Sequence, residues 1–341
     1  MATQIWKLFG TVIVSVVCSF ALAPLQADEK YSFAEPHLGT IVEITLYAAD
    51  ENGANQAAQA AFRRVKDLDH IFSDYKPDSE VMRLCARAGE DEAVAVSPEL
   101  FHLLKRSIEI SNQTNGAFDV TIGPLVQLWR QSRKRKVLPT QDEIQQARSS
   151  VGWKFLVLDD AQQTVKLTKR GMRLDFGGIA KGYVAQEMSR ILREQGFDQS
   201  LVAVAGDIVA GNPPPGTTGW KVGVAPLDRP NGAVSRLLSL RDCAVSTSGD
   251  AFQFVEIAGV RYSHIVDPQT GLGLTYRSSV TVVAPEGAIA DSLATAICIL
   301  GPERGLPLLD LHDQTAALIV HASSDGPQVV ESKSFATFDA R

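Results

Sequence analysis

The chain has 341 residues, of which 45% are hydrophobic and 21% are charged, and its formal net charge is −6 at pH 7. This length and composition predict a globular protein with enough interior for a sizeable core. The mild acidic excess argues against nucleic acid as the main partner, because phosphate binding needs concentrated Lys and Arg. The one basic run, RQSRKRK at residues 130–136, is short and is interpreted as a solvated loop or helix end.

Residues 1–27 predict a secretory signal peptide. Lys7 precedes an apolar run at residues 8–25, and the small residue Ala27 stands before a polar stretch. A retained transmembrane anchor is the main alternative, since the apolar run is nearly long enough to span a bilayer. Lipid attachment at Cys18 is disfavoured, because Val17 precedes it. We expect a periplasmic protein that is cleaved near Ala27, with inner-membrane tethering if the leader is retained.

The cysteines beyond the leader are Cys85, Cys243 and Cys298. Their odd number, with no CxxC motif and no neighbouring histidines, predicts neither a disulfide framework nor a zinc site.

Helices and strands are both predicted along the rest of the chain. Alternating and apolar residues predict paired strands over 31–47, and an Ala-rich periodic stretch predicts a helix over 54–68. Further expected elements are a short helix after Pro77, helices over 97–115 and 140–149, a hairpin over 155–167, strands near 201–205, 220–225, 237–240 and 279–283, and helices over 181–195, 288–300 and 302–311. This order predicts an α+β fold rich in antiparallel sheet. The pattern contains no linker, so residues 28–341 are expected to form a single domain of two interlocked lobes whose boundary is not placed.

A strand that ends in Asp175 is predicted to pass through Gly177 and Gly178 into a helix whose first turn carries Lys181. Glycines at such a junction let backbone N–H groups approach an anion, and the helix N-terminus adds a favourable dipole. The alternative is a Gly-Gly turn with no ligand.

Asp291 and Thr295 are four residues apart, so on a helix they share one face. Their oxygen atoms suit Mg²⁺ better than Zn²⁺. Alternatively, Asp291 caps its helix and Thr295 is a packing residue.

Two further segments carry candidate groups. His264 stands just before the rigid turn DPQTG, where it could act as a base or be satisfied by a backbone carbonyl. The sequence STSGD at residues 246–250, which includes Thr247, is interpreted as a hydroxyl-rich turn that presents donors to a phosphate or merely caps the turn.

Taken together, these segments resemble the ApbE-type FAD:protein FMN transferases over nearly the whole mature chain. The matching motifs, in order, are HLGT at 37–40, FSDYKPDSE at 72–80, GAFDVT at 116–121, PL and LW at 124–129, LDFGGIAKGY at 174–183, AGD at 205–207, STSGD, HIVDPQTG at 264–271 and ADSLATA at 290–296. The resemblance implies an α+β architecture with a T-fold-like sheet region, FAD as substrate, and Mg²⁺ at its diphosphate.

The resemblance also implies roles for individual residues. Mg²⁺ would be held by Asp291, Thr295 and the main-chain carbonyl of Ala180, and His264 would be the catalytic base. The residues that would contact FAD are Leu38, Tyr75, Ala117, Phe118, Asp119, Gly177, Gly178, Lys181, Thr247, His264 and Ile265. Leu38 departs from the methionine that the family usually has there, and Ala205-Gly206 replaces a double glycine.

The implied reaction is Mg²⁺-dependent transfer of the FMN half of FAD to a Thr or Ser hydroxyl, with release of AMP. The implied acceptors are flavoprotein subunits of membrane redox complexes that face the periplasm. One alternative is an FAD diphosphatase that gives free FMN and AMP; within the family, a tyrosine at the position of Tyr75 favours transfer. A second alternative is a periplasmic flavin-binding protein without turnover.

Overall fold

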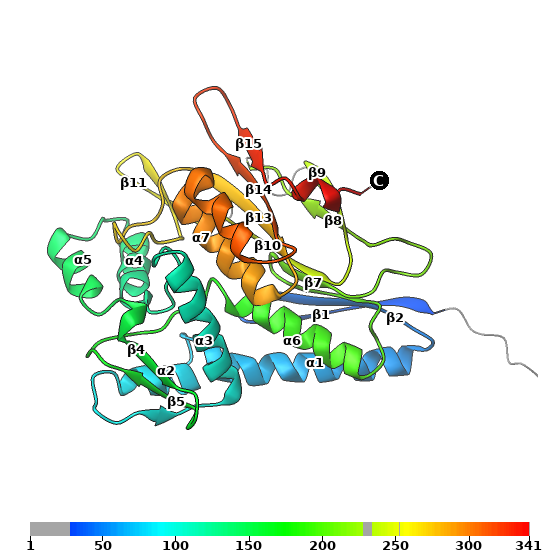
Figure 1. Cartoon of the computed structure of the whole chain (residues 1–341), viewed down its shortest axis with the longest axis horizontal. Helices are drawn as coiled ribbons and strands as arrows, with labels where there is room; N and C mark the ends of the chain where they lie inside the picture. The colour runs from blue at the N-terminus through cyan, green and yellow to red at the C-terminus, as the bar shows by residue number, and fades with distance from the viewer. Residues whose placement is uncertain (1–27, 228–233, 252, 341) are drawn as a thin grey trace, which may run out of the picture.

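The computed structural model describes residues 28–227, 234–251 and 253–340 (Figure 1). The predicted signal peptide at 1–27 lies outside these residues, so its cleavage stays a prediction. Within the described ranges, no helix combines the length and the apolar character that a membrane crossing requires. The expected α+β class is confirmed, because helices pack on one large antiparallel sheet.

The main sheet contains β1 (Glu29–His37), β2 (Thr40–Ala48), β6 (Ser200–Val204), β7 (Asp207–Ala210), β10 (Cys243–Gly249), β13 (Ser278–Ala284), β14 (Ala316–His321) and β15 (Gln328–Glu331). The strands lie in that order across the sheet, and every neighbouring pair is antiparallel. Side chains alternate between the two faces, so Val42, Ile44 and Leu46 of β2 all point into the core. The paired strands predicted over 31–47 are confirmed as the β1–β2 hairpin.

Three long helices cover one face of this sheet: α1 (Glu51–Phe72), α6 (Ala180–Glu194) and α7 (Gly287–Gly305) (Figure 1). Helices α6 and α7 pack against each other and against β7 and β10 at the centre of the sheet. The first two turns of α7 are buried throughout, which is typical of a helix that is enclosed on all sides. A charged side chain on this part of α7, Asp291, therefore needs a partner inside the protein.

A second group of elements, which follows α1 in the sequence, lies beside the three long helices (Figure 1). It comprises α2 (Glu80–Ala86), β3 (Val94–Ala95), α3 (Pro98–Gln113), α4 (Gly123–Arg135), α5 (Gln141–Arg148), a 3₁₀ turn (Trp153–Phe155), β4 (Leu156–Asp159) and β5 (Thr164–Leu167). The predicted helix starts are confirmed: the Ser97 hydroxyl accepts from the backbone of Leu100, and Thr140 forms a capping box with Glu143.

The remaining elements are two hairpins and two 3₁₀ segments: β8 (Trp220–Val224) with β9 (Arg236–Leu240), β11 (Phe254–Ile257) with β12 (Val260–Ser263), Leu306–Leu311 and Phe335–Phe338. Cys85, Cys243 and Cys298 are free and buried, in agreement with the prediction that they form no disulfide framework.

Two local predictions are wrong. Residues 246–249 are not a turn but the second half of β10, because β13 pairs with them along their whole length. The segment before Asp175 is not a strand; only an isolated bridge joins Ile122 to Arg173 there. The break between the helices expected over 288–300 and 302–311 is confirmed, because α7 is kinked at Gly301, whose φ of 72° precedes Pro302, and the 3₁₀ segment Leu306–Leu311 follows it.

Candidate functional site

The candidate site begins where α6 starts against α7. A Cβ atom on Gly182 would lie 2.0 Å from the carbonyl oxygen of Gly287 and 3.0 Å from the Cβ of Asp291. A Cβ on Gly178 would lie 2.9 Å from the hydroxyl oxygen of Thr295. These two glycines therefore let the turn before α6 and its first helical turn approach α7 closely enough to meet Asp291 and Thr295.

Asp291 supports the N-terminus of α6 and not that of its own helix. Its Oδ2 accepts a hydrogen bond from the backbone N–H of Gly182 at 3.2 Å, whereas Glu286 precedes the first residue of α7. The alternative in which Asp291 caps its own helix is therefore wrong. A carboxylate at this position satisfies one of the free N–H groups at the start of α6 and complements the helix dipole.

Lys181 lies between two buried carboxylates. Its Nζ is 2.9 Å from Asp207 Oδ2 and 3.8 Å from Asp291 Oδ2, and Asp207 also accepts a hydrogen bond from the Ser246 hydroxyl. We call Lys181, Asp207 and Asp291 the lysine cluster. The sequence analysis quoted Asp207 in a motif but gave it no role; in the structure it shares the inner face of β7 with Val209, which lies two residues later in the main core.

The charges of the lysine cluster change one another's pKa values. Burial raises the pKa of Asp291, and the neighbouring Asp207 raises it further, against the opposing effect of Lys181. Burial alone would lower the pKa of Lys181, but the Asp291 and Asp207 carboxylates raise it well above its ordinary value. The cluster thus holds one ammonium group and two acids in a site that favours additional positive charge.

Hydroxyl groups line the same region. Thr295 Oγ1 is 3.3 Å from Ser248 Oγ, whereas Thr247 faces the other side of the sheet, where its Oγ1 is 2.9 Å from Thr281 Oγ1. Asp291 and Thr295 lie on one face of α7 toward the start of α6, as their spacing predicted. In the part of the chain that the structure describes, no group of three or more His, Cys, Asp or Glu could hold a metal ion.

His264 follows β12 and is half-buried. Its backbone N–H donates to the carbonyl of Gln253 at 3.1 Å, and its ring Nδ1 lies 3.2 Å from the same oxygen. Because a carbonyl can only accept, Nδ1 carries the proton and the lone pair is on Nε2. Burial lowers the pKa of His264 to about 4, and the charges of Arg133 and Lys181 act in the same direction. The imidazole is therefore neutral at pH 7 and able to accept a proton. The next residue, Ile265, is half-buried and packs against the main core.

Tyr75 lies on the loop after α1, where 76% of its surface is exposed. The guanidinium of Arg130 lies over its ring, 4.6 Å from the centroid. Arg130 also forms ion pairs with Asp74 and, at 3.0 Å, with Asp175. We call Asp74, Arg130 and Asp175 the arginine cluster. Asp175 Oδ1 accepts from the N–H of Gly177 at 2.9 Å, so this cluster adjoins the Gly-Gly segment.

Sequence analysis missed Arg130, because it assigned the basic run to solvent. The run is indeed a helix end, as one interpretation held, but the helix, α4, begins at Gly123 and was not predicted. Leu125, Trp129 and Ser132 are its buried face. Their helical spacing was the signal that could have identified α4 and placed Arg130 beside that face.

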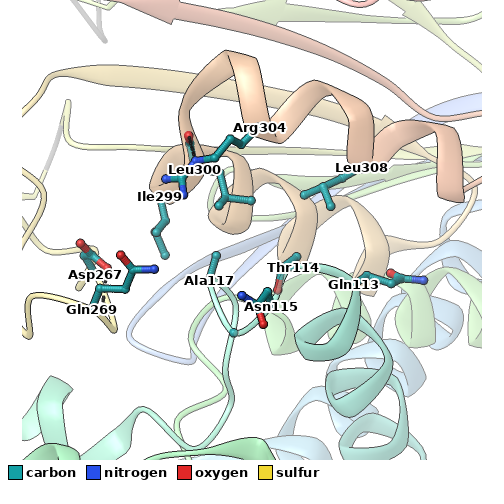
Figure 2. Close-up of a pocket in the computed structure, with 11 residues that line it drawn as sticks. Gln113, Thr114, Asn115, Ala117, Asp267, Gln269, Ile299, Leu300, Arg304 and Leu308 are labelled. Atoms are coloured by element: carbon teal, nitrogen blue, oxygen red, sulfur yellow. Dashed lines mark hydrogen bonds between the residues drawn. The ribbon is translucent and has the colours of Figure 1, made fainter.

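A cavity of about 270 Å³ opens beside residues 113–117. Figure 2 shows Ala117 and Asn115 facing Ile299 and Leu300 of α7, with Asp267 and Gln269 at one side. Of the three neighbouring residues predicted to contact FAD, only Ala117 lines it. Phe118 and Asp119 are buried, and both Asp119 oxygens accept hydrogen bonds within the chain, from Thr121 and from the backbone of Trp153.

Leu38 is at the tip of the β1–β2 hairpin and lines a second hollow with His37, Thr40 and Asp69. Leu38 and Gly39 form a two-residue turn with φ values of 53° and 70°, the signs that a type I′ turn requires. A leucine rarely adopts a positive φ. This strained backbone at the rim of a hollow is a separate reason to regard Leu38 as functional.

Known proteins resemble this chain over most of its length. The sequence profile of the ApbE family matches residues 38–319. The FAD:protein FMN transferase of Treponema pallidum is 32% identical over 314 residues, which cover 87% of this chain and 86% of that protein. The FAD:protein FMN transferase of Vibrio cholerae is 29% identical over 314 residues, which cover 91% of this chain and 93% of that protein.

Solved structures give the same result. The flavin transferase ApbE from Vibrio cholerae matches with a TM-score of 0.82 and 29% identity, covering 91% of this chain and 99% of its own. The ApbE protein from Thermotoga maritima matches with a TM-score of 0.81 and 28% identity, covering 92% of this chain and 100% of its own. The expected ApbE architecture is thereby confirmed. The chain belongs to the ApbE family and, like the relatives named above, is a transferase.

Proposed function

We propose that this protein transfers the FMN half of FAD to a Thr or Ser hydroxyl of an acceptor protein and releases AMP. The observation that carries the proposal is the lysine cluster, in which a paired ammonium and two acids meet the N-terminus of a helix at a glycine-lined turn. Such a site suits a diphosphate that arrives with a divalent cation. The names of the relatives, FAD:protein FMN transferases, supply the substrate class.

The neighbourhood of the lysine cluster suits a long dinucleotide. The cavity at Ala117 is lined by Ile299, one helical turn beyond Thr295 on α7, which corresponds to about 6 Å along the helix axis. We assign this cavity to the adenosine half of FAD. Tyr75 is connected to the Gly-Gly segment through the arginine cluster, and we assign its surroundings, together with Leu38, to the flavin ring.

The donor set fits Mg²⁺. Asp291, the Thr295 hydroxyl and the main-chain carbonyl of Ala180 would hold the ion, and all three supply hard oxygen atoms. Asp291 is 1% exposed and has a raised pKa, so a cation would stabilise its charged form. When bound, Mg²⁺ would offset the negative charge that develops on the diphosphate.

Each of the remaining site residues would then have one role in the reaction. The Gly177–Gly178 turn, beside the start of α6, would orient the diphosphate. Nε2 of His264 takes the proton of the acceptor hydroxyl, whose oxygen attacks the FMN-side phosphorus. The new P–O bond forms as the bond between the phosphorus and the bridging oxygen breaks, and AMP leaves with that oxygen. Lys181 stabilises the departing phosphate through its positive charge.

We further propose that the reaction takes place in the periplasm, on flavoprotein subunits of membrane redox complexes. The support is the signal-peptide pattern at residues 1–27. A retained leader would tether the enzyme to the inner membrane, close to such acceptors.

The decisive experiment incubates the protein with FAD, Mg²⁺ and a candidate acceptor domain, and measures AMP, free FMN and the mass of the acceptor. Transfer adds one FMN to the acceptor for each AMP. Free FMN without a labelled acceptor would support the diphosphatase instead, and tight FAD binding without AMP would support a passive flavin-binding protein.

The proposed base can be tested with a matched pair of histidines. His264→Ala should slow transfer by roughly 10²- to 10⁴-fold and leave FAD binding in place. His70→Ala is the control, because the His70 Nδ1 also donates to a backbone carbonyl, that of Lys66, on an exposed helix end. If His264→Ala transfers FMN at the native rate, His264 is not the base.

A further inference from the structure

The arginine cluster joins three segments that are far apart in the sequence. Arg130 projects from α4 and forms ion pairs with Asp74 in the loop after α1 and with Asp175 in the segment before α6. About a third of the Arg130 side chain remains exposed, whereas the Asp175 side chain is 11% exposed. The guanidinium is therefore held in place from two sides, and a planar group with two anchors has little freedom to rotate.

The third contact of Arg130 is the ring of Tyr75. The ring lies under the guanidinium, 4.6 Å from its carbon, yet 76% of the tyrosine surface is exposed. The other support that the loop gives Tyr75 is a long hydrogen bond, 3.4 Å, from its backbone N–H to the Ser73 hydroxyl. A cation–π contact at an exposed site contributes only about 0.5–1 kcal/mol, so it cannot explain the stability of the fold, but it is enough to bias the orientation of an exposed ring.

An exposed aromatic ring with one face against a fixed cation presents its other face for stacking. Aromatic rings prefer offset-stacked or edge-to-face partners, and a ring that is already oriented loses less entropy when a partner arrives. The arginine cluster also adjoins the Gly-Gly segment, because Asp175 accepts from Gly177. A planar ligand on Tyr75 would thus lie beside the site proposed for the diphosphate.

We propose that Arg130 is a positioning residue, which holds Tyr75 as a preformed stacking surface for the isoalloxazine ring of FAD. This inference rests on the proposed function, which makes FAD the substrate. Arg130, one residue of the basic run, thus strengthens flavin binding by orienting Tyr75.

The test is a double-mutant cycle with FAD binding as the readout. Flavin fluorescence is titrated in EDTA, and the KM for FAD and kcat of transfer are measured in parallel with Mg²⁺. Arg130→Lys keeps the charge but loses the planar fork, and it should weaken FAD binding by roughly 2- to 5-fold and raise KM while sparing kcat. Tyr75→Leu should weaken binding at least as much, and Tyr75→Phe should bind almost as well as the native protein.

The double variant decides whether Arg130 acts through Tyr75. In a Tyr75→Leu background, Arg130→Lys should weaken FAD binding no further, because the ring that it orients is gone. If Arg130→Lys weakens binding equally in both backgrounds, or leaves native binding unchanged, the positioning role is wrong. If Arg130→Lys does not fold, the same cycle is run with Asp74→Asn, which frees one anchor of the guanidinium and leaves the Asp175 pair intact.

A matched control is available elsewhere in the chain. Arg236 forms ion pairs with Asp339 and Glu331 and lies over the ring of Phe335 at 5.0 Å, but that ring is fully buried. Arg236→Lys should therefore leave FAD affinity unchanged. An acceptor that stays unlabelled with the native enzyme, while the binding cycle behaves as described, would refute the transfer proposal and leave the role of Arg130 standing.

Discussion

The lysine cluster and the arginine cluster each place one cation between two carboxylates, and both adjoin the Gly177–Gly178 turn. They differ in the elements that hold their residues and in how deeply those residues are buried. The lysine cluster is built on α6, β7 and α7, and its two acids are 3% and 1% exposed. The arginine cluster draws two of its three members from loops and stands next to an exposed ring.

This difference corresponds to two kinds of task. A compact ammonium among buried acids controls charge, because a desolvated site magnifies electrostatic interactions. A planar guanidinium at the surface controls orientation, because solvent screens its charge but not its shape. We therefore expect changes in the lysine cluster to affect turnover or folding, and changes in the arginine cluster to affect flavin affinity.

The largest expected effect comes from the lysine cluster. Asp291→Asn removes the negative charge proposed to hold the cation, and AMP release with saturating FAD and Mg²⁺ should fall by roughly 10³-fold. The exposed Asp313 provides the control, and Asp313→Asn should release AMP at the native rate. Native turnover by Asp291→Asn would mean that charge at this position is not used in the reaction.

The next effect is on stability and concerns the helix contact that builds the lysine cluster. Gly182→Ala places a methyl group against the backbone of Gly287, and the free energy of unfolding should fall by about 1–3 kcal/mol in urea titrations. Gly53→Ala in α1 meets its nearest atom at 3.5 Å and should be neutral or stabilising by up to about 1 kcal/mol. Equal effects of the two substitutions would contradict the close-approach role of Gly182.

A smaller effect is expected from the arginine cluster. Asp74→Asn weakens one anchor of Arg130, so the KM for FAD should rise by roughly 2- to 5-fold while kcat stays within about 2-fold of native. Steady-state transfer assays over a range of FAD concentrations separate the two constants. A fall in kcat with an unchanged KM would mean that the arginine cluster acts in the chemical step and not in flavin binding.

The smallest effect concerns the pH dependence of the base. Because the pKa of His264 is lowered to about 4, its neutral form persists as pH falls from 7 to 5, and the rate constant for transfer should decline only as pH approaches 4. Arg133 helps to lower this pKa, so Arg133→Gln should move the acidic limb upward by less than about one pH unit. If the transfer rate of the native enzyme already declines near pH 6.5, His264 is not desolvated in the working enzyme.

Local patterns were sufficient for much of the fold and for the residue types of the candidate site. The caps at Ser97 and Thr140 and the alternation in β2 act over a few residues, so they can be recognised without a structure. The same holds for the shared face of Asp291 and Thr295, since helical spacing alone places them together. The family motifs added the expected substrate, which no local pattern indicates.

The sequence by itself determined the α+β class, the main helix starts and the residue types that we propose handle an anion and a proton. Only the tertiary structure decided that Asp207 meets Lys181, that residues 246–249 form a central strand, and that Arg130 lies over Tyr75. These contacts join residues from 26 to 55 positions apart, and they arise from the packing of α6, α7 and α4. Pairing over such distances depends on how whole elements bury their apolar faces, which short-range propensity does not encode.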